Sequence, residues 1–253
     1  MSAHKIDVNG ISIHYEKVGR GPNVVLLLPG GLGSTRTDFD EQLKEFDRLD
    51  FTTIAWDPPG FGYSRPPERS YTKDVFVEDA KLAHQMMKNL GYERYSVVGW
   101  SDGGKTALIM AFLFPENVQK LVVFGVIMYG TRQTWLILNQ TKSVAVWSGK
   151  RRKAFEKVYG DQLESLWSHH VESMQTCGAI SNVNQHEKEI MTIKCPVFAL
   201  HGDVDPIVKY DQVEYLKKLV PHARIHRFPK GSHDMHIAFA DEFNEMVQEF
   251  LLP

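Results

Sequence analysis

The stretch Tyr95-Ser96-Val97-Val98-Gly99-Trp100-Ser101-Asp102-Gly103-Gly104 decides the fold of this chain. An apolar strand is expected to end at Val98, and a helical pattern follows over residues 105–114. Between them lies Gly-x-Ser-x-Gly, the pattern of a nucleophile elbow, in which a sharp strand-to-helix turn exposes the serine oxygen. Ser101 is therefore a candidate nucleophile.

The same turn matches a second pattern. Gly99, Gly104, Lys105 and Thr106 fit the phosphate-binding loop G-x-x-x-x-G-K-[ST], which also joins a strand to a helix. Asp102 argues against a phosphate-binding loop, because its carboxylate would lie inside the loop and repel the phosphate groups. We therefore interpret Lys105 as an ordinary residue of the following helix and keep nucleotide binding as a distant alternative.

Composition limits the remaining possibilities. The chain has 253 residues, 43% of them apolar, a size and composition that suit one α/β domain with an insertion. Its formal net charge of −2 gives no sign of a nucleic-acid or membrane partner. Two cysteines make neither a disulfide framework nor a zinc site. No apolar signal region begins the chain, and no stretch reaches the about 18 apolar residues of a membrane helix. We expect a monomer in an intracellular location, cytoplasmic or mitochondrial.

Strand and helix patterns alternate along most of the chain, which predicts a mostly parallel sheet with helices on both faces. Expected strands are residues 5–8 and 11–18 around an Asn-Gly turn, then 23–28, 51–56, 95–98, 120–124, 197–201 and 224–228. Expected helices are residues 38–49, 75–90, 105–114, 210–219 and 235–252.

Residues 128–190 interrupt this alternation. They contain no convincing strand, and helices are expected over residues 134–147, 150–159 and 161–175. Residues 1–127 and 191–253 are therefore the predicted core, and residues 128–190 are a predicted helical lid. The basic run of residues 150–153 is interpreted as the solvated face of a helix, and packing is expected for most of the lid tryptophans, Trp135, Trp147 and Trp167.

A serine needs a positioned base to become a strong nucleophile. Asp205 and His233 each follow a predicted buried strand, in the order Ser, Asp, His that α/β-hydrolases use. Asp205 would orient the imidazole, and His233 would carry the proton from Ser101 to the leaving group. Asp203 is interpreted as a loop acid that caps the next helix.

With these residues the chain resembles the α/β-hydrolases of the serine-ester class, and within them the valacyclovir hydrolase (biphenyl hydrolase-like) group. The resemblance covers nearly the whole chain and is carried by the motifs Leu-Pro-Gly-Gly-Leu-Gly-Ser at 28–34, Trp-Asp-Pro-Pro-Gly-Phe-Gly-Tyr-Ser at 56–64, Gly-Trp-Ser-Asp-Gly-Gly at 99–104, His-Gly-Asp-Val-Asp-Pro at 201–206 and Gly-Ser-His at 231–233. It implies Ser101, Asp205 and His233 as the triad and an oxyanion hole from the N–H groups of Gly31 and Asp102. A reaction of this kind is expected to need no metal or organic cofactor.

The sequence differs from the typical sequence of this group at three places, which limits the properties that can be expected of this chain. Pro29-Gly30 replaces the frequent His-Gly, which leaves a backbone donor untouched, and Pro59 stands where Arg is frequent. The segment 129–140 differs most, so substrate preference is the least transferable property.

Asp102 suggests a substrate class. A carboxylate beside the nucleophile opposes a growing oxyanion, since like charges about 4 Å apart cost about 1 kcal/mol even in water. A substrate ammonium, as in an α-amino acid ester, would offset that cost; alternatively, Asp102 only complements the helix N-terminus. The resemblance favours the ammonium.

We therefore predict hydrolysis of a small-molecule ester, an α-amino acid ester, through an acyl-enzyme on Ser101, with Asp102 and Trp100 as substrate-binding residues. General carboxylesterase activity and carbon–carbon bond hydrolysis of ring-cleavage products are the alternatives.

Overall fold

A computed structural model of the chain describes residues 2–178 and 185–253. Its centre is an eight-stranded sheet in the order β1-β2-β4-β3-β5-β6-β7-β8. The strands are β1 (Ser2–Val8), β2 (Ile11–Gly19), β3 (Asn23–Leu28), β4 (Phe51–Trp56), β5 (Tyr95–Trp100), β6 (Val118–Phe124), β7 (Val197–Gly202) and β8 (Arg224–Phe228). Pairing is antiparallel for β1 with β2 and for β2 with β4, and parallel everywhere else in the sheet. The prediction of a mostly parallel α/β sheet is confirmed.

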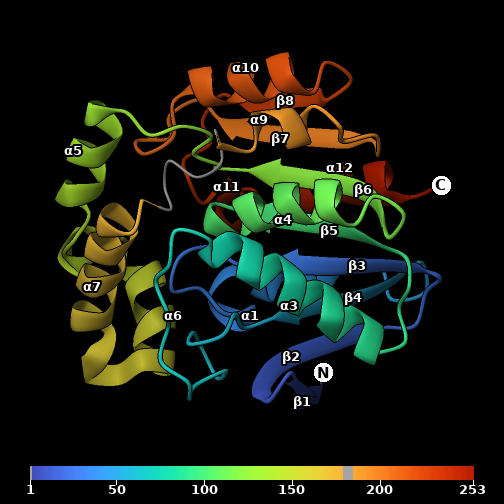
Figure 1. Cartoon of the computed structure of the whole chain (residues 1–253), viewed down its shortest axis with the longest axis horizontal. Coiled ribbons are helices and arrows are strands. Elements are labelled where there is room, and N and C mark those ends of the chain that lie inside the picture. Colours follow the sequence, from blue (N-terminus) through green and yellow to red (C-terminus); the bar gives the residue numbers. More distant parts are fainter. Residues whose placement is uncertain (1, 179–184) are drawn as a thin grey trace.

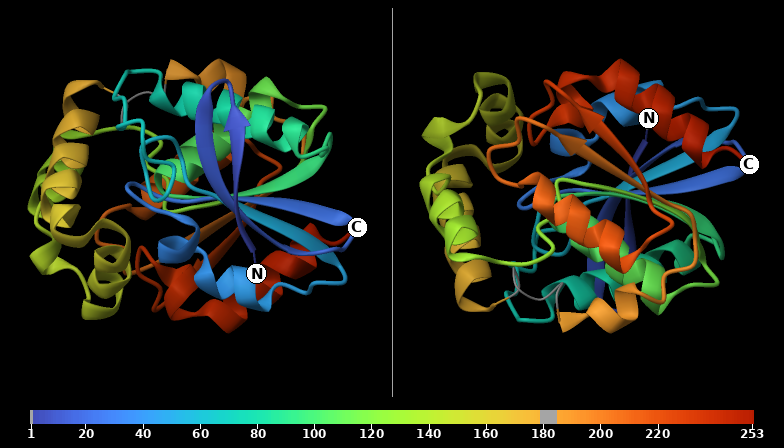
Figure 2. Two further views of the ribbon diagram at one scale, coloured as in Figure 1. Left: turned by 90° about the horizontal axis from the view of Figure 1, so that it is seen from below. Right: turned by 90° about the horizontal axis from the view of Figure 1, so that it is seen from above.

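Helices cover both faces of this sheet (Figure 2). One face carries α3 (Val75–Asn89), α4 (Asp102–Leu113), α9 (Glu187–Ile190) and α10 (Tyr210–Leu219); the other carries α1 (Thr35–Asp38), α2 (Asp40–Glu45), α11 (Met235–Ala238) and α12 (Ala240–Leu251). Because side chains alternate along a strand, Leu26 and Leu28 of β3 pack into the first layer and Val25 and Leu27 into the second.

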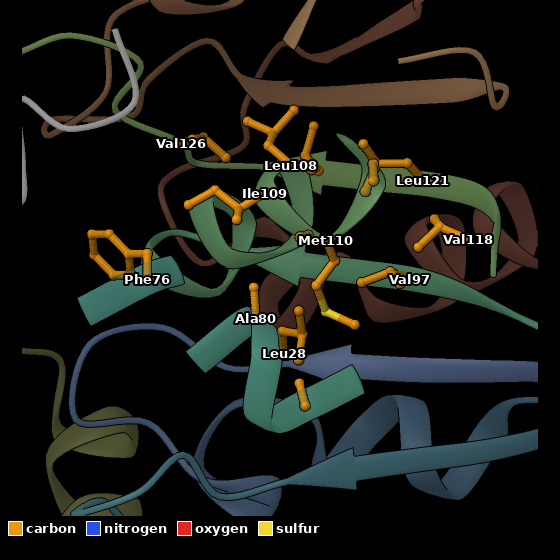
Figure 3. Packing of buried hydrophobic residues seen from close by; sticks show 14 of the residues in the cluster. Leu28, Phe76, Ala80, Val97, Leu108, Ile109, Met110, Val118, Leu121 and Val126 are labelled. Carbon is orange, nitrogen blue, oxygen red and sulfur yellow. The ribbon is translucent and has the colours of Figure 1, made fainter. Parts of the chain in front are cut away.

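The first layer surrounds α4 (Figure 3). Apolar side chains of α3 and α4 meet those of β3, β5 and β6, and the residues that show this are Leu28, Phe76, Ala80, Val97, Leu108, Ile109, Met110 and Leu121. Nearly all of α4 is buried, from Gly103 to Ala111. A helix buried on this scale holds its first residue, which follows Ser101, in a fixed place.

Some predicted boundaries are wrong. β5 continues to Trp100 instead of ending at Val98, because Gly99 and Trp100 still pair with β6. The predicted helix 38–49 is two short helices that meet at Phe39, whose ring is fully buried against the sheet. The closing helix is likewise divided, at Phe239, into α11 and α12.

The chain between β6 and β7 forms α5 (Arg132–Gln140), the 3₁₀ turn η1 (Val144–Val146), α6 (Gly149–Tyr159), the 3₁₀ turn η2 (Gly160–Gln162) and α7 (Leu163–Thr176). The predicted helix 134–147 is too long, since α5 ends at Gln140. Helices α5, α6 and α7 gather at one end of the sheet, away from the C-terminus (Figure 1). Residues 179–184 of the predicted lid and residue 1 of the predicted core lie outside the described residues.

These helices are attached to the core through a separate apolar cluster. Leu32 and Phe61, from two core loops, pack with Phe155 and Tyr159 of α6. The hydroxyl of Tyr159 donates to the Leu32 carbonyl and accepts the Gly62 N–H, both at 2.7 Å. In the described part of the chain, no helix is both long and apolar enough to cross a bilayer.

Candidate active site

The turn after β5 holds its serine in an unusual conformation. Ser101 has φ 55° and ψ −118°, a region that residues other than glycine rarely adopt. A β-carbon on Gly103 would lie 2.1 Å from the Leu28 carbonyl oxygen, and one on Gly99 would lie 2.5 Å from the Gly103 carbonyl oxygen. The two glycines therefore permit the close approach of strand and helix that projects Ser101 from the sheet edge.

Three predicted residues meet at this edge in a chain of hydrogen bonds. His233 Nε2 lies 3.2 Å from Ser101 Oγ, and His233 Nδ1 lies 2.8 Å from Asp205 Oδ2. The other oxygen of Asp205 accepts the backbone N–H groups of Ile207 and Val208 at 2.8 and 2.9 Å. Although burial opposes ionisation, the adjacent His233 and these hydrogen bonds hold the pKa of Asp205 below its usual value. The carboxylate is thus charged and fixed where it can orient the imidazole.

Trp100 has a structural contact that the sequence did not indicate. Its ring is buried, and its Nε1–H donates to the His233 carbonyl at 2.8 Å. The same ring lines the cavity beside Ser101. Trp100 therefore positions the His233 loop as well as facing the cavity.

The interpretation of Asp203 as a helix cap is wrong. Its Oδ1 accepts from Nε of Arg227 at 2.6 Å, and α10 begins after Lys209 without a side-chain cap. The chain turns after β7 so that only Asp205 faces His233, a difference that two acids so close in sequence do not reveal.

The loop after β3 provides the second half of the candidate oxyanion hole. Within the described residues, the N–H groups of Gly31 and Asp102 take part in no hydrogen bond. The loop is anchored beside them, because Asp38 Oδ2 accepts the Gly30 N–H at 2.9 Å and the Gly30 carbonyl accepts the Gly33 N–H at 2.9 Å. Two free backbone donors that line the same cavity as Ser101 suit an anionic oxygen.

The carboxylate of Asp102 has two basic neighbours, Lys105 and His170. The interpretation of Lys105 as an ordinary helix residue is therefore wrong. Lys105 Nζ lies 3.2 Å from Asp102 Oδ1, and only 1% of the lysine side chain is exposed. His170 Nε2, from α7, lies 3.3 Å from Asp102 Oδ2. Burial opposes the charge of Asp102, but Lys105 and His170 together hold its pKa well below the usual range. The chain thus supplies its own cation, Lys105, beside the candidate nucleophile.

A cavity of about 450 Å³ opens beside Ser101, between the core and helices α5 to α7. Trp147 and Trp167 line it with their rings 4.9 Å apart, whereas Trp135 packs against the main core. Among the residues that the structure describes, no group of three or more His, Cys, Asp or Glu side chains could hold a metal ion.

Three basic side chains of this cavity were not identified from the sequence: Lys105, Arg151 and His170. For Lys105 a signal existed, since residues three apart on a helix are neighbours and Asp102 precedes it by three. Arg151 was assigned to a solvated helix face, yet it lines the cavity, while Arg152 and Lys153 beside it are exposed. His170 comes from a distant helix and has no local sequence signal.

The comparisons with known proteins agree with this architecture. The profile of the α/β-hydrolase fold family matches residues 23–147. Serine hydrolase BPHL of Mus musculus is 40% identical over 252 residues, which cover 99% of this chain and 87% of the relative, and the Homo sapiens protein is 39% identical with the same coverage. A serine hydrolase of Cycloclasticus zankles has a solved structure with a TM-score of 0.83 at 19% identity, covering 98% of this chain and 97% of that one.

The last likeness concerns the fold alone, whereas the first two extend over nearly the whole sequence at close to two identical residues in five. The chain therefore belongs to the α/β-hydrolase family, within the group of the BPHL serine hydrolases.

Proposed function

We propose that the protein hydrolyses small carboxylic esters through an acyl-enzyme on Ser101. The observation that carries this proposal is the continuous chain of hydrogen bonds from Ser101 through His233 to Asp205, at the mouth of a cavity large enough for a small molecule. The relatives named serine hydrolase add support, since they match this chain at nearly full length.

In the proposed reaction, Ser101 Oγ attacks the ester carbonyl while His233 Nε2 takes the serine proton. The N–H groups of Gly31 and Asp102 bind the oxyanion of the tetrahedral intermediate. Its collapse breaks the bond to the alcohol, which leaves with the proton held by His233. Water then attacks the acyl-enzyme in the same way and releases the acid, while Asp205 keeps the imidazole oriented. The helices of residues 128–190 act as the lid of the cavity.

Within this class, we infer that α-amino acid esters are substrates. The ammonium would approach Asp102 Oδ2 beside His170 Nε2, because Oδ1 already faces Lys105. Lys105 balances much of the charge of Asp102. A substrate ammonium therefore gains less binding free energy there than it would beside an unpaired carboxylate, and uncharged acyl groups are accepted as well.

Site-directed variants test the proposal on a panel of amino acid esters and simple acyl esters. Ser101→Ala should abolish hydrolysis with the fold intact, since loss of a triad member can lower kcat by about 10⁶-fold. Asp205→Asn should be severe, and Asp203→Asn, its neighbour on the same loop, should be mild. Activity of Ser101→Ala within tenfold of wild type would overturn the assignment of the nucleophile.

A further inference from the structure

Arg151 enters the cavity from the first turn of α6. Its guanidinium carbon lies 5.0 Å from the ring centroid of Trp100, 4.6 Å from that of Trp147 and 4.8 Å from that of Phe155. Trp100 precedes Ser101 directly, so the cation lies in the same cavity as the candidate nucleophile. The three rings hold the guanidinium by cation–π contacts and fix its place.

The guanidinium has no partner of opposite charge within reach. Among the residues described, none of its nitrogens forms a hydrogen bond or lies within 4.0 Å of a carboxylate. Asp38 and Asp234 are the carboxylates whose charges act on it from beyond that distance, and burial nevertheless lowers the pKa of Arg151. Arg69 shows the alternative, since its two terminal nitrogens contact both oxygens of Asp79.

The geometry favours a planar anion. Contacts with aromatic faces occupy the flat sides of a guanidinium and leave its N–H edge for hydrogen bonds, and that edge matches the two oxygens of a carboxylate. Asp102, the carboxylate next to Ser101, is not the partner of Arg151, because it is already paired with Lys105. The guanidinium is half-buried and forms no hydrogen bond with the described residues, so a ligand carboxylate can supply paired hydrogen bonds where the three surrounding rings reduce screening by water.

We propose that Arg151 binds a carboxylate group of the substrate, so that the protein prefers esters that carry a carboxylate away from the scissile bond. The inference rests on the proposed ester hydrolysis and adds the chemical class of the substrate. The carboxylate belongs to the acyl part or to the alcohol part, and two substrate pairs distinguish these.

The first pair is monomethyl adipate and methyl hexanoate, which differ by a carboxylate on the acyl chain. The second pair is 4-carboxyphenyl acetate and phenyl acetate, which differ by a carboxylate on the alcohol part. For each pair the measurement is the ratio of kcat/KM for the charged ester to that for the neutral ester. Wild type should give a ratio above one for one of the pairs.

Arg151→Gln should lower that ratio by about 10- to 100-fold, the worth of hydrogen bonds to a charged group, with the change mainly in KM. Arg151→Lys should give an intermediate ratio, because an ammonium keeps the charge but not the paired donors. Arg152→Gln is the matched control: this exposed neighbour on α6 pairs with Glu156 and should leave the ratio at the wild-type value.

An equal ratio in wild type and Arg151→Gln would overturn the proposal, and so would a wild-type ratio of one or less for both pairs. If Arg151→Gln does not fold, Arg151→Lys decides, since an unchanged ratio there contradicts paired binding. Hydrolysis of the neutral esters that is lost in Ser101→Ala supports the proposed function whatever Arg151 does, so the two proposals fail separately.

Discussion

Single residues set the charge beside Ser101, the candidate nucleophile. Asp102 follows Ser101 directly, yet its carboxylate is balanced by Lys105 from one side and faces His170 from the other. The lysine also lies 4.7 Å from the ring centroid of Phe76, so its charge is enclosed on both sides. A buried pair of this kind makes each partner depend on the other, because removing one leaves the other uncompensated.

Lys105→Met should therefore change substrate preference. With the internal cation gone, a substrate ammonium becomes the partner that Asp102 needs, so kcat/KM for a valyl ester should rise relative to an uncharged ester of similar size. We expect a change in this ratio of about tenfold, near the lower limit for a charge-assisted hydrogen bond.

Asp102→Asn provides the control for this experiment. It should lower the same ratio, and adding Lys105→Met to Asp102→Asn should not raise it again. If Lys105→Met raised the ratio equally with and without Asp102, the lysine would act on the substrate by another route.

At the scale of elements, the site depends on the contact between the start of α4 and the end of β3. Gly103 faces the backbone carbonyls of Leu28 and Pro29, at positions where a β-carbon would lie 2.1 and 2.4 Å away. Backbone atoms cannot turn aside as a flexible side chain can. Any side chain at this position must displace the helix or the strand, and with it the turn that carries Ser101.

Gly103→Ala should consequently destabilise the fold and misplace the nucleophile. The overpacking should cost about 1–3 kcal/mol, measured by urea denaturation, and activity should fall with it. Gly149→Ala is the matched control on α6, because no atom lies within 4 Å of its added carbon. That control should be neutral or slightly stabilising, since alanine favours the helix. Equal stability of the two variants would contradict the close contact.

Two buried titratable residues, His236 and Asp38, link the stability of the whole molecule to pH. His236 Nε2 lies 2.9 Å from the Asp38 carbonyl oxygen. Burial lowers the pKa of His236 to about 3 and raises the pKa of Asp38 to about 6. On acidification the unfolded chain protonates its histidine first, which destabilises the fold between about pH 6.5 and 3. Asp38 acts oppositely, since the folded state takes up its proton between about pH 6 and 3.8.

The two effects offset each other between about pH 6 and 4, and Asp38→Asn should remove the compensation. The free energy of unfolding should then fall more steeply with decreasing pH than in wild type, by about 1.4 kcal/mol per pH unit for one proton. Asparagine keeps an oxygen for the Gly30 N–H, so the loop should stay in place. Urea titrations at pH 6.5, 5.5 and 4.5 measure the two slopes, and parallel slopes would refute the prediction.

Local patterns in the sequence were sufficient for the sheet and for the three residues of the proposed triad. Strands β3, β4 and β8 have their predicted bounds, because continuous apolar runs and alternating patterns identify a buried strand without knowledge of its neighbours. Ser101, Asp205 and His233 each follow such a strand, and carboxyl ends of parallel strands meet at one edge of a sheet. Their proximity in space thus follows from their positions in the chain.

The tertiary structure alone decided the charges of the cavity. Arg151 and His170 belong to polar helix segments, and their place in the cavity depends on how α6 and α7 pack against the core. That packing joins segments far apart in the sequence, such as Tyr159 of α6 and Leu32, or His170 of α7 and Asp102 of α4, so no local pattern encodes it. The sequence by itself determined the fold and the candidate reaction, whereas substrate preference depends on long-range contacts that only the folded chain creates.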